Sequence, residues 1–167
     1  MRDTARKDAQ SGLGYKITGR VWRYNSSFDF LDSLLIFKSI SSNDSLTDVD
    51  TDEKGRIYAT SISKDSGKYW VLITEINPLF EIEKQILIGN NSASDIQIEV
   101  QGCHVYVSFI DSLSTGIVLK LLRLDENLNV LSAESYFTGT GKDKVSMLAI
   151  KDKQILLLSL GKGNVTD

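Results

Sequence analysis

Three aspartates at alternate positions are the residues best placed for chemistry. Asp48, Asp50 and Asp52, in the segment DVDTDEKG, have the one, three, five spacing of the ligands in a calcium-binding loop. Such a loop also requires glycine at its sixth position and a bidentate carboxylate at its twelfth. Here those positions hold Glu53 and Ala59. The motif therefore favours a solvated turn, with a calcium site as the alternative.

A cysteine beside a histidine is the second candidate. Cys103 and His104 could form a thiolate–imidazole pair that acts as a nucleophile or binds a metal ion. Neighbouring residues of a strand point to opposite faces, so we expect a cysteine at a turn and a partly exposed histidine that do not act together. Since the chain has one histidine, acid–base chemistry would need carboxylates or lysines, and none of these form a distinctive pair. We therefore predict no catalytic, cofactor-binding or metal-binding residue and favour a protein that is not an enzyme.

Two tryptophans and one basic loop complete the set of candidates. Trp22 and Trp70 could stack on sugars or on a partner protein, but packing in the core is the better interpretation. Lys142, Asp143 and Lys144, in TGTGKDKV, suggest a phosphate site. The GTGK segment lacks the spacing of a P-loop and no helix is expected after it, so we interpret it as a loop between strands.

Composition and charge exclude several classes of partner. The 167 residues are 41% hydrophobic and carry a net charge of −3, which is typical of one globular domain and provides no basic surface for nucleic acid or anionic lipid. A single cysteine excludes an intrachain disulfide. The polar N-terminal segment has no apolar core of a signal peptide, and no apolar run approaches the about 20 residues that span a membrane. We expect a soluble protein with no nucleic-acid or membrane partner.

The elements that must position these residues come from a repeated segment. It begins at Tyr24, Ile76 and Leu124 and each time reads as an apolar residue, an Asn or Asp, a short turn and alternating apolar positions. The turns open at Asn25, Asn77 and Asp125 and carry an apolar residue at Phe28, Phe80 and Leu128. A period of about fifty residues indicates a repeat architecture. Arg23, Glu75 and Arg123 are equivalent in the repeat and are expected where each hairpin meets water.

A second unit of strand, turn and strand lies between these hairpins. Its copies begin at Asp48, Ile98 and Leu148. With the four strands of one repeat named A to D, the chain reads CD, ABCD, ABCD, AB, which gives twelve strands and no helix. The predicted boundaries are a polar segment over 1–14, a C–D hairpin over 15–45, blades over 46–94 and 95–143, an A–B hairpin over 144–161 and a tail over 162–167.

Two stretches carry a resemblance to a known fold. VDTDEKGRIYAT resembles the A and B strands of the bacterial and archaeal beta-propeller repeat families, and LKLLRLDENLNVLSAESYF resembles their C-to-D hairpin. The resemblance covers about residues 15 to 160 and implies a blade without specifying an activity. The glycine before the B strand departs from the pattern, since Gly55 is followed by a shifted Gly102 and by none in DKQI. We predict an all-β fold of antiparallel four-stranded propeller blades, with a β-trefoil as the alternative.

The order of the strands raises the question of what completes the fold. Propellers have four to eight blades, so three repeats do not close a ring. In one hypothesis two chains form a six-bladed ring, each donating its AB strands to the CD strands of its partner. In the other, the chain is a piece of a longer propeller. We expect a non-catalytic interaction or scaffold module that binds protein or itself through its terminal strands, and the alternative is an enzyme or carbohydrate-binding propeller whose site forms in the complete ring.

Overall fold

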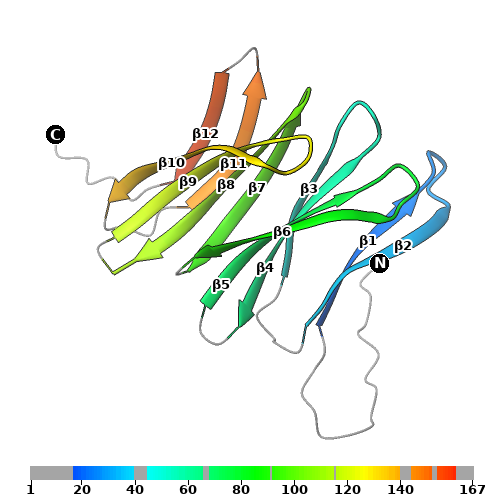
Figure 1. Cartoon of the computed structure of the whole chain (residues 1–167), viewed down its shortest axis with the longest axis horizontal. Coiled ribbons are helices and arrows are strands. Elements are labelled where there is room, and N and C mark those ends of the chain that lie inside the picture. The colour runs from blue at the N-terminus through cyan, green and yellow to red at the C-terminus, as the bar shows by residue number, and fades with distance from the viewer. Residues whose placement is uncertain are drawn as a thin grey trace, which may run out of the picture.

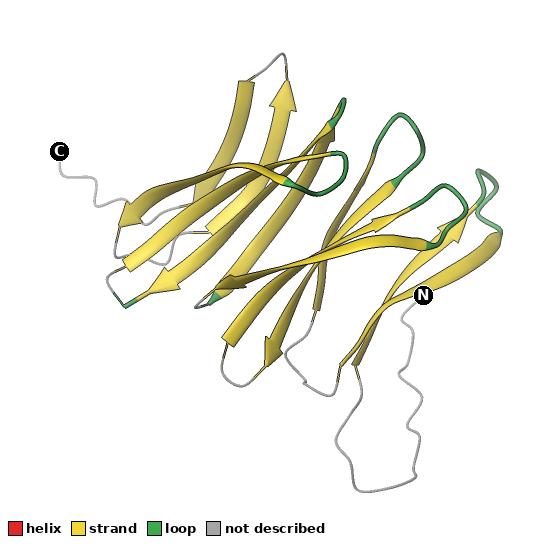
Figure 2. Ribbon diagram, in the orientation of Figure 1, coloured by secondary structure: helices red, strands yellow, loops and turns green. Residues whose placement is uncertain are grey.

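Twelve strands make up almost all of the chain that the structure describes. The structure is a computed structural model, and it describes residues 17–39, 45–65, 68–90, 92–114, 116–139, 144–151 and 154–160. The strands are β1 (Ile17–Tyr24), β2 (Phe30–Ser39), β3 (Ser45–Thr51), β4 (Ile57–Asp65), β5 (Lys68–Ile76), β6 (Ile82–Asn90), β7 (Ala93–Gln101), β8 (His104–Leu113), β9 (Gly116–Asp125), β10 (Val130–Gly139), β11 (Lys144–Lys151) and β12 (Gln154–Leu160). Within these ranges there is no helix (Figure 2). The prediction of an all-β protein with antiparallel sheets is confirmed, while the segments 1–14 and 162–167 lie outside the described residues.

Four separate sheets follow one another along the chain. Strands β3-β4-β5-β6 and β10-β9-β8-β7 form two four-stranded sheets, and the hairpins β1-β2 and β11-β12 form two-stranded sheets. The two hairpins lie at opposite ends of the row of sheets (Figure 1). Strands β3, β7 and β11 are neighbours, so the first strand of one sheet lies beside the first strand of the next. Among the described residues, no helix is long and apolar enough to cross a membrane.

One type of turn joins strands at four places. In each, the side-chain Oδ1 of an Asn or Asp accepts a hydrogen bond from the main-chain N–H four residues later, at 2.8 to 3.0 Å. The turns are Asn25–Asp29, Asp52–Arg56, Asn77–Glu81 and Asp125–Asn129. The fourth residue of each has a positive φ, which is 79° at Gly55, 64° at Phe28, 67° at Phe80 and 57° at Leu128. Glycine adopts this conformation without strain, whereas for a residue with a side chain the conformation costs about 1 kcal/mol of backbone strain.

Burial of the apolar side chain offsets this strain in two of the turns. Phe80 is 4% exposed and packs with Ile36 and Ile76, where the β3–β6 sheet meets the β1–β2 hairpin. Leu128 is 2% exposed and belongs to a larger cluster between the β7–β10 sheet and the β3–β6 sheet, which includes Tyr58. In both cases the turn between the third and fourth strands of a sheet is covered by the sheet that precedes it in the chain.

Candidate functional site

Two of the three aspartates bind the backbone of the neighbouring sheet. Asp48 Oδ2 accepts a hydrogen bond of 3.0 Å from the N–H of Ile98, and Asp50 Oδ2 accepts one of 2.6 Å from the N–H of Val100. Both donors lie on β7, at the edge of its own sheet. An unpaired edge N–H that loses water is costly, so these carboxylates stabilise the contact between two sheets.

The third aspartate organises the β3–β4 turn. Asp52 Oδ1 accepts hydrogen bonds from the N–H groups of Lys54 and Arg56, and its Oδ2 lies 2.6 Å from Arg56 Nε. The side chain of Asp52 is 2% exposed, so the expectation of a solvated turn is wrong at this residue. Within the residues that the structure describes, no group of three or more His, Cys, Asp or Glu side chains is placed to hold a metal ion.

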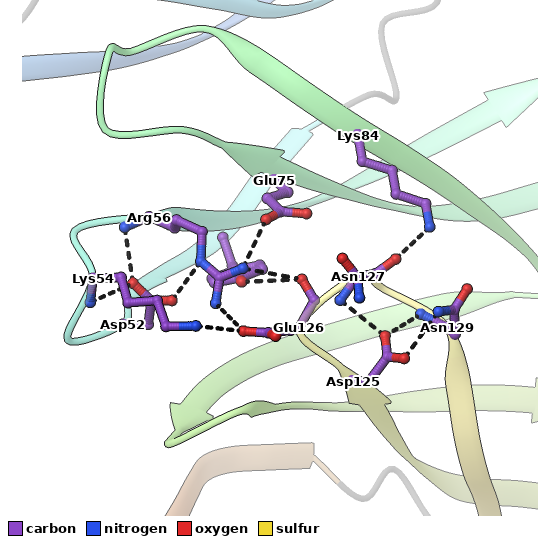
Figure 3. A network of polar contacts seen from close by, with 10 residues as sticks. Asp52, Lys54, Arg56, Glu75, Lys84, Asp125, Glu126, Asn127 and Asn129 are labelled. Carbon is purple, nitrogen blue, oxygen red and sulfur yellow. Dashed lines mark hydrogen bonds and ion pairs between the residues drawn. The ribbon is translucent and has the colours of Figure 1, made fainter.

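Arg56 is the centre of a polar network between two sheets (Figure 3). The side chain of Arg56 is 14% exposed, and its guanidinium contacts Asp52, Glu75 at 3.3 Å and Glu126 at 3.1 Å. Glu126 lies in the β9–β10 turn of the next sheet, where it also pairs with Lys54 at 2.7 Å. In the same turn, the main-chain oxygen of Asn127 accepts a hydrogen bond from Lys84 Nζ of β6. The turn that carries Leu128 is thus held in place by polar contacts as well as by apolar packing.

Opposite charges in this network perturb one another. Burial raises the pKa of Glu75 above its ordinary value, and the guanidinium of Arg56 opposes that rise. Burial alone would also raise the pKa of Asp52, but hydrogen bonds from the main chain and side chain of Arg56 bring it below its ordinary value. At the exposed end, hydrogen bonds from Lys54 and then Arg56 lower the pKa of Glu126. Each of these carboxylates is paired with the side chain of Arg56 or Lys54. Such pairing suits a role in holding the two sheets together better than a role in acid–base catalysis.

The three equivalent polar positions near the hairpin tips have different environments. Arg123 is exposed, as expected, but Glu75 is only 4% exposed and the prediction that it meets water is wrong. Arg23 is half-buried, and its guanidinium lies 4.6 Å from the centre of the Phe80 ring. The sequence did not indicate that Arg56 pairs with carboxylates of two sheets. The turn Asp52–Arg56 could have been recognised, because it has the same spacing as the other three turns.

Cys103 and His104 approach each other more closely than the sequence suggests. The Sγ of Cys103 lies 3.6 Å from Nδ1 of His104. Cys103 is exposed in the turn between β7 and β8 and His104 is partly exposed at the start of β8, as predicted, and the short distance arises because Cys103 does not alternate as a strand residue does. Lys142 and Asp143 lie outside the described residues.

An apolar surface on the β1–β2 hairpin is exposed where its counterparts are buried. Trp22 is 47% exposed, Tyr24 53% and Phe28 88%. The residues at the same repeat positions are 0 to 6% exposed, and they are Thr74, Ile76 and Phe80 in one copy and Leu122, Leu124 and Leu128 in the other. Those residues face the preceding sheet, whereas among the described residues no sheet precedes the β1–β2 hairpin, so the difference in exposure comes from the surroundings and not from the residue types.

Aromatic side chains dominate this surface. Phe30, from β2, lies with its ring centre 5.8 Å from that of Trp22 and 5.9 Å from that of Tyr24. We call the surface formed by Trp22, Tyr24, Phe28 and Phe30 the aromatic face. The prediction that Trp22 packs in the core is wrong. Trp70 is half-buried across from Gly89, where a Cβ would lie 2.9 Å from its ring.

Comparisons of the chain with models of protein families, with curated proteins and with solved structures find no significant match.

Proposed function

We propose that the chain is a non-catalytic interaction module of the β-propeller type. In this proposal the two four-stranded sheets are blades and the terminal hairpins are halves of blades. Four separate meandering sheets in a row, with their first strands adjacent, support this interpretation over a β-trefoil, in which strands from all repeats share one barrel.

The aromatic face is the observation that carries the proposal. Trp22, Tyr24 and Phe28 are exposed at three positions that are buried in both other copies of the repeat. Phe28 also holds a φ of 64° without the burial that offsets this strain at Phe80. Covering the face would remove apolar area from water and supply the missing offset. We infer that the face binds another surface.

The chemistry of the face favours a protein surface as its ligand. Large aromatic side chains bury much area at a small cost in conformational entropy, and they are enriched where protein partners bind. Phe28 and Phe30 offer no hydrogen-bonding group to the hydroxyls of a sugar. A carbohydrate-binding or catalytic propeller remains the alternative, and it requires convergent polar groups in a completed ring.

Tryptophan fluorescence and sedimentation test the proposal together. We expect the wild-type chain to sediment faster as its concentration rises, with a blue shift in emission because Trp22 enters an interface. Phe28→Ser should abolish both changes. Leu87→Ser is the matched control, because Leu87 is 61% exposed on the outer strand β6 and should tolerate serine. A blue shift caused by a soluble oligosaccharide in a chain that stays monomeric would instead establish the carbohydrate alternative and overturn the proposal.

A further inference from the structure

We propose that the surface which covers the aromatic face is a second copy of this chain, whose strand β12 pairs antiparallel with β1. This inference depends on the proposed interaction function and adds the partner and the register. The β7–β10 sheet of the same second copy then covers the turn that carries Phe28.

The open edges of the two hairpins are complementary. Within the described residues, β5 and β9 each pair on both sides, whereas β1 pairs with β2 and β12 pairs with β11. The second and third strands of both complete sheets pair without a bulge, and Ile57 faces Ile76 as Val105 faces Leu124. In the part of the chain that the structure describes, β12 is a second strand with no third strand beside it, and β1 is a third strand with no second strand beside it. Pairing them satisfies two rows of edge N–H and C=O groups.

The repeat fixes the register of this pairing. Ile155 lies at the start of β12 as Ile57 and Val105 lie at the starts of β4 and β8, and it is 41% exposed. Tyr24, the last residue of β1, is equivalent in the repeat to Ile76 of β5 and Leu124 of β9. Equivalence of the pairs therefore places Ile155 of one copy opposite Tyr24 of the other, with both side chains exposed before association and buried after it.

A receiving surface for Phe28 exists on the β7–β10 sheet. Within one chain, the turn that carries Leu128 covers Tyr58, which is fully buried and donates a hydrogen bond of 3.5 Å to the main-chain oxygen of Glu126. Tyr106 occupies the position of Tyr58 in the next sheet and is only half-buried. A β1–β2 hairpin added beside β12 brings the turn of Phe28 to Tyr106. The sheets of this chain already form this contact once, which is why a second copy fits.

Two copies joined at both junctions close a ring. Each copy supplies two complete sheets, and the pairs of hairpins supply two shared ones, so the ring holds six four-stranded sheets. Six lies within the range of four to eight blades that close propellers. The hairpins lie at opposite ends of the chain's row of sheets, as closure requires (Figure 1). The two junctions are identical, so the dimer has two-fold symmetry and leaves neither β1 nor β12 as an edge strand.

Engineered cysteines test the register. In a Cys103→Ser background, we would mix a Tyr24→Cys chain with an Ile155→Cys chain under mild oxidation. We expect a disulfide-linked dimer as the main product, because paired residues bring their Cα atoms to within about 5.5 Å. The matched control replaces Tyr24→Cys by Arg20→Cys, which lies about 13 Å further along β1 and beyond the reach of a disulfide. The control mixture should stay largely unlinked.

The possible results separate this inference from the function it depends on. Association through the aromatic face without the Tyr24–Ile155 crosslink, or with equal crosslinking in the Arg20 control, would overturn the register and leave the interaction function standing. A wild-type chain that stays monomeric at every concentration would overturn both. If that monomer also shelters Phe28 from solvent, another part of the same chain is the occupant.

Discussion

Replacing the residue of positive φ by glycine should have opposite effects in two equivalent turns. Phe28 and Phe80 have φ angles of 64° and 67°, but they are 88% and 4% exposed. Glycine relieves the backbone strain at both sites. At Phe80 it also removes a buried ring and its contact with Arg23. The relief of backbone strain is the same in Phe28→Gly and Phe80→Gly, so the difference between their unfolding free energies measures the contribution of ring burial at Phe80.

The two terms differ enough to decide the sign. Relief of the left-handed conformation stabilises the fold by about 1 kcal/mol at each site. Truncation of a buried phenylalanine costs about 3–5 kcal/mol, and loss of the stacked guanidinium adds about 0.5–1 kcal/mol. We expect Phe80→Gly to lower the free energy of unfolding by about 3–4 kcal/mol. Phe28→Gly should raise it by up to about 1 kcal/mol in a single chain.

Urea denaturation at low protein concentration is the assay, because association would stabilise the wild type and hide the gain at Phe28. Leu128→Gly is a second buried case, at 2% exposed and a φ of 57°, and should resemble Phe80→Gly. If Phe28→Gly destabilised a monomeric chain as much as Phe80→Gly, the aromatic face would be buried within one molecule. A neutral Phe80→Gly would refute the idea that burial of the turn residue offsets its strain.

Two further predictions concern the polar contacts between sheets. Arg56→Met leaves the buried carboxylate of Glu75 without its cation and should lower the free energy of unfolding by about 3 kcal/mol near neutral pH. Because burial already holds the pKa of Glu75 above its ordinary value and Arg56 opposes that rise, the variant takes up a proton at a higher pH, so its deficit should shrink when urea denaturation is repeated near pH 5. Asp50→Ala removes the acceptor for the N–H of Val100 and should cost about 1–3 kcal/mol, measured from the thermal midpoint. Calcium should leave the wild-type midpoint unchanged, because Asp50 already binds this backbone group.

Matched variants separate these effects from loss of charge. Arg123→Met changes an exposed arginine at the position equivalent to Glu75, and Glu53→Ala removes an exposed carboxylate near Asp50. Both should alter stability by less than about 0.5 kcal/mol. A loss in Arg123→Met as large as that in Arg56→Met would show that overall charge, and not the buried network, is responsible. A rise of several degrees in the midpoint with calcium would show that the aspartates can leave the backbone to bind a cation.

The strands could be predicted because repetition resolves what one copy leaves open. FDFLDSLLIF has an apolar spacing that suits a helix, but its alignment with two strand-like copies gave the strand that is observed at β2 (Phe30–Ser39). The turn residues were also informative, since Asn25, Asn77 and Asp125 each open the same hydrogen-bonded turn. The hydrogen bonds of these turns join residues at most four apart, so the residues that form them can be recognised in the sequence.

Burial of individual side chains could not be predicted in the same way, because it depends on neighbours that are distant in the chain. Glu75 and Arg123 occupy the same repeat position. Glu75 is buried because it pairs with Arg56, which also contacts the β9–β10 turn of the next sheet at Glu126. Trp22 was expected in the core by the same reasoning that applies to its buried counterparts, and it is exposed because no sheet precedes its hairpin among the described residues. Equivalent positions in a repeat share a backbone conformation but not an environment.

The strain at Phe28 connects these observations to function. A turn with glycine at its fourth position exists in the same chain, at Gly55, where an added Cβ would meet no other atom within 4 Å. An uncovered turn therefore has an unstrained solution available, and Phe28 does not use it. Phe80 shows what a phenylalanine at this position gains, since burial against another sheet outweighs its strain. Within the described residues Phe28 is both strained and exposed, and a surface that covered it would supply the offset that burial gives Phe80, which is why we propose Phe28 as part of an interface.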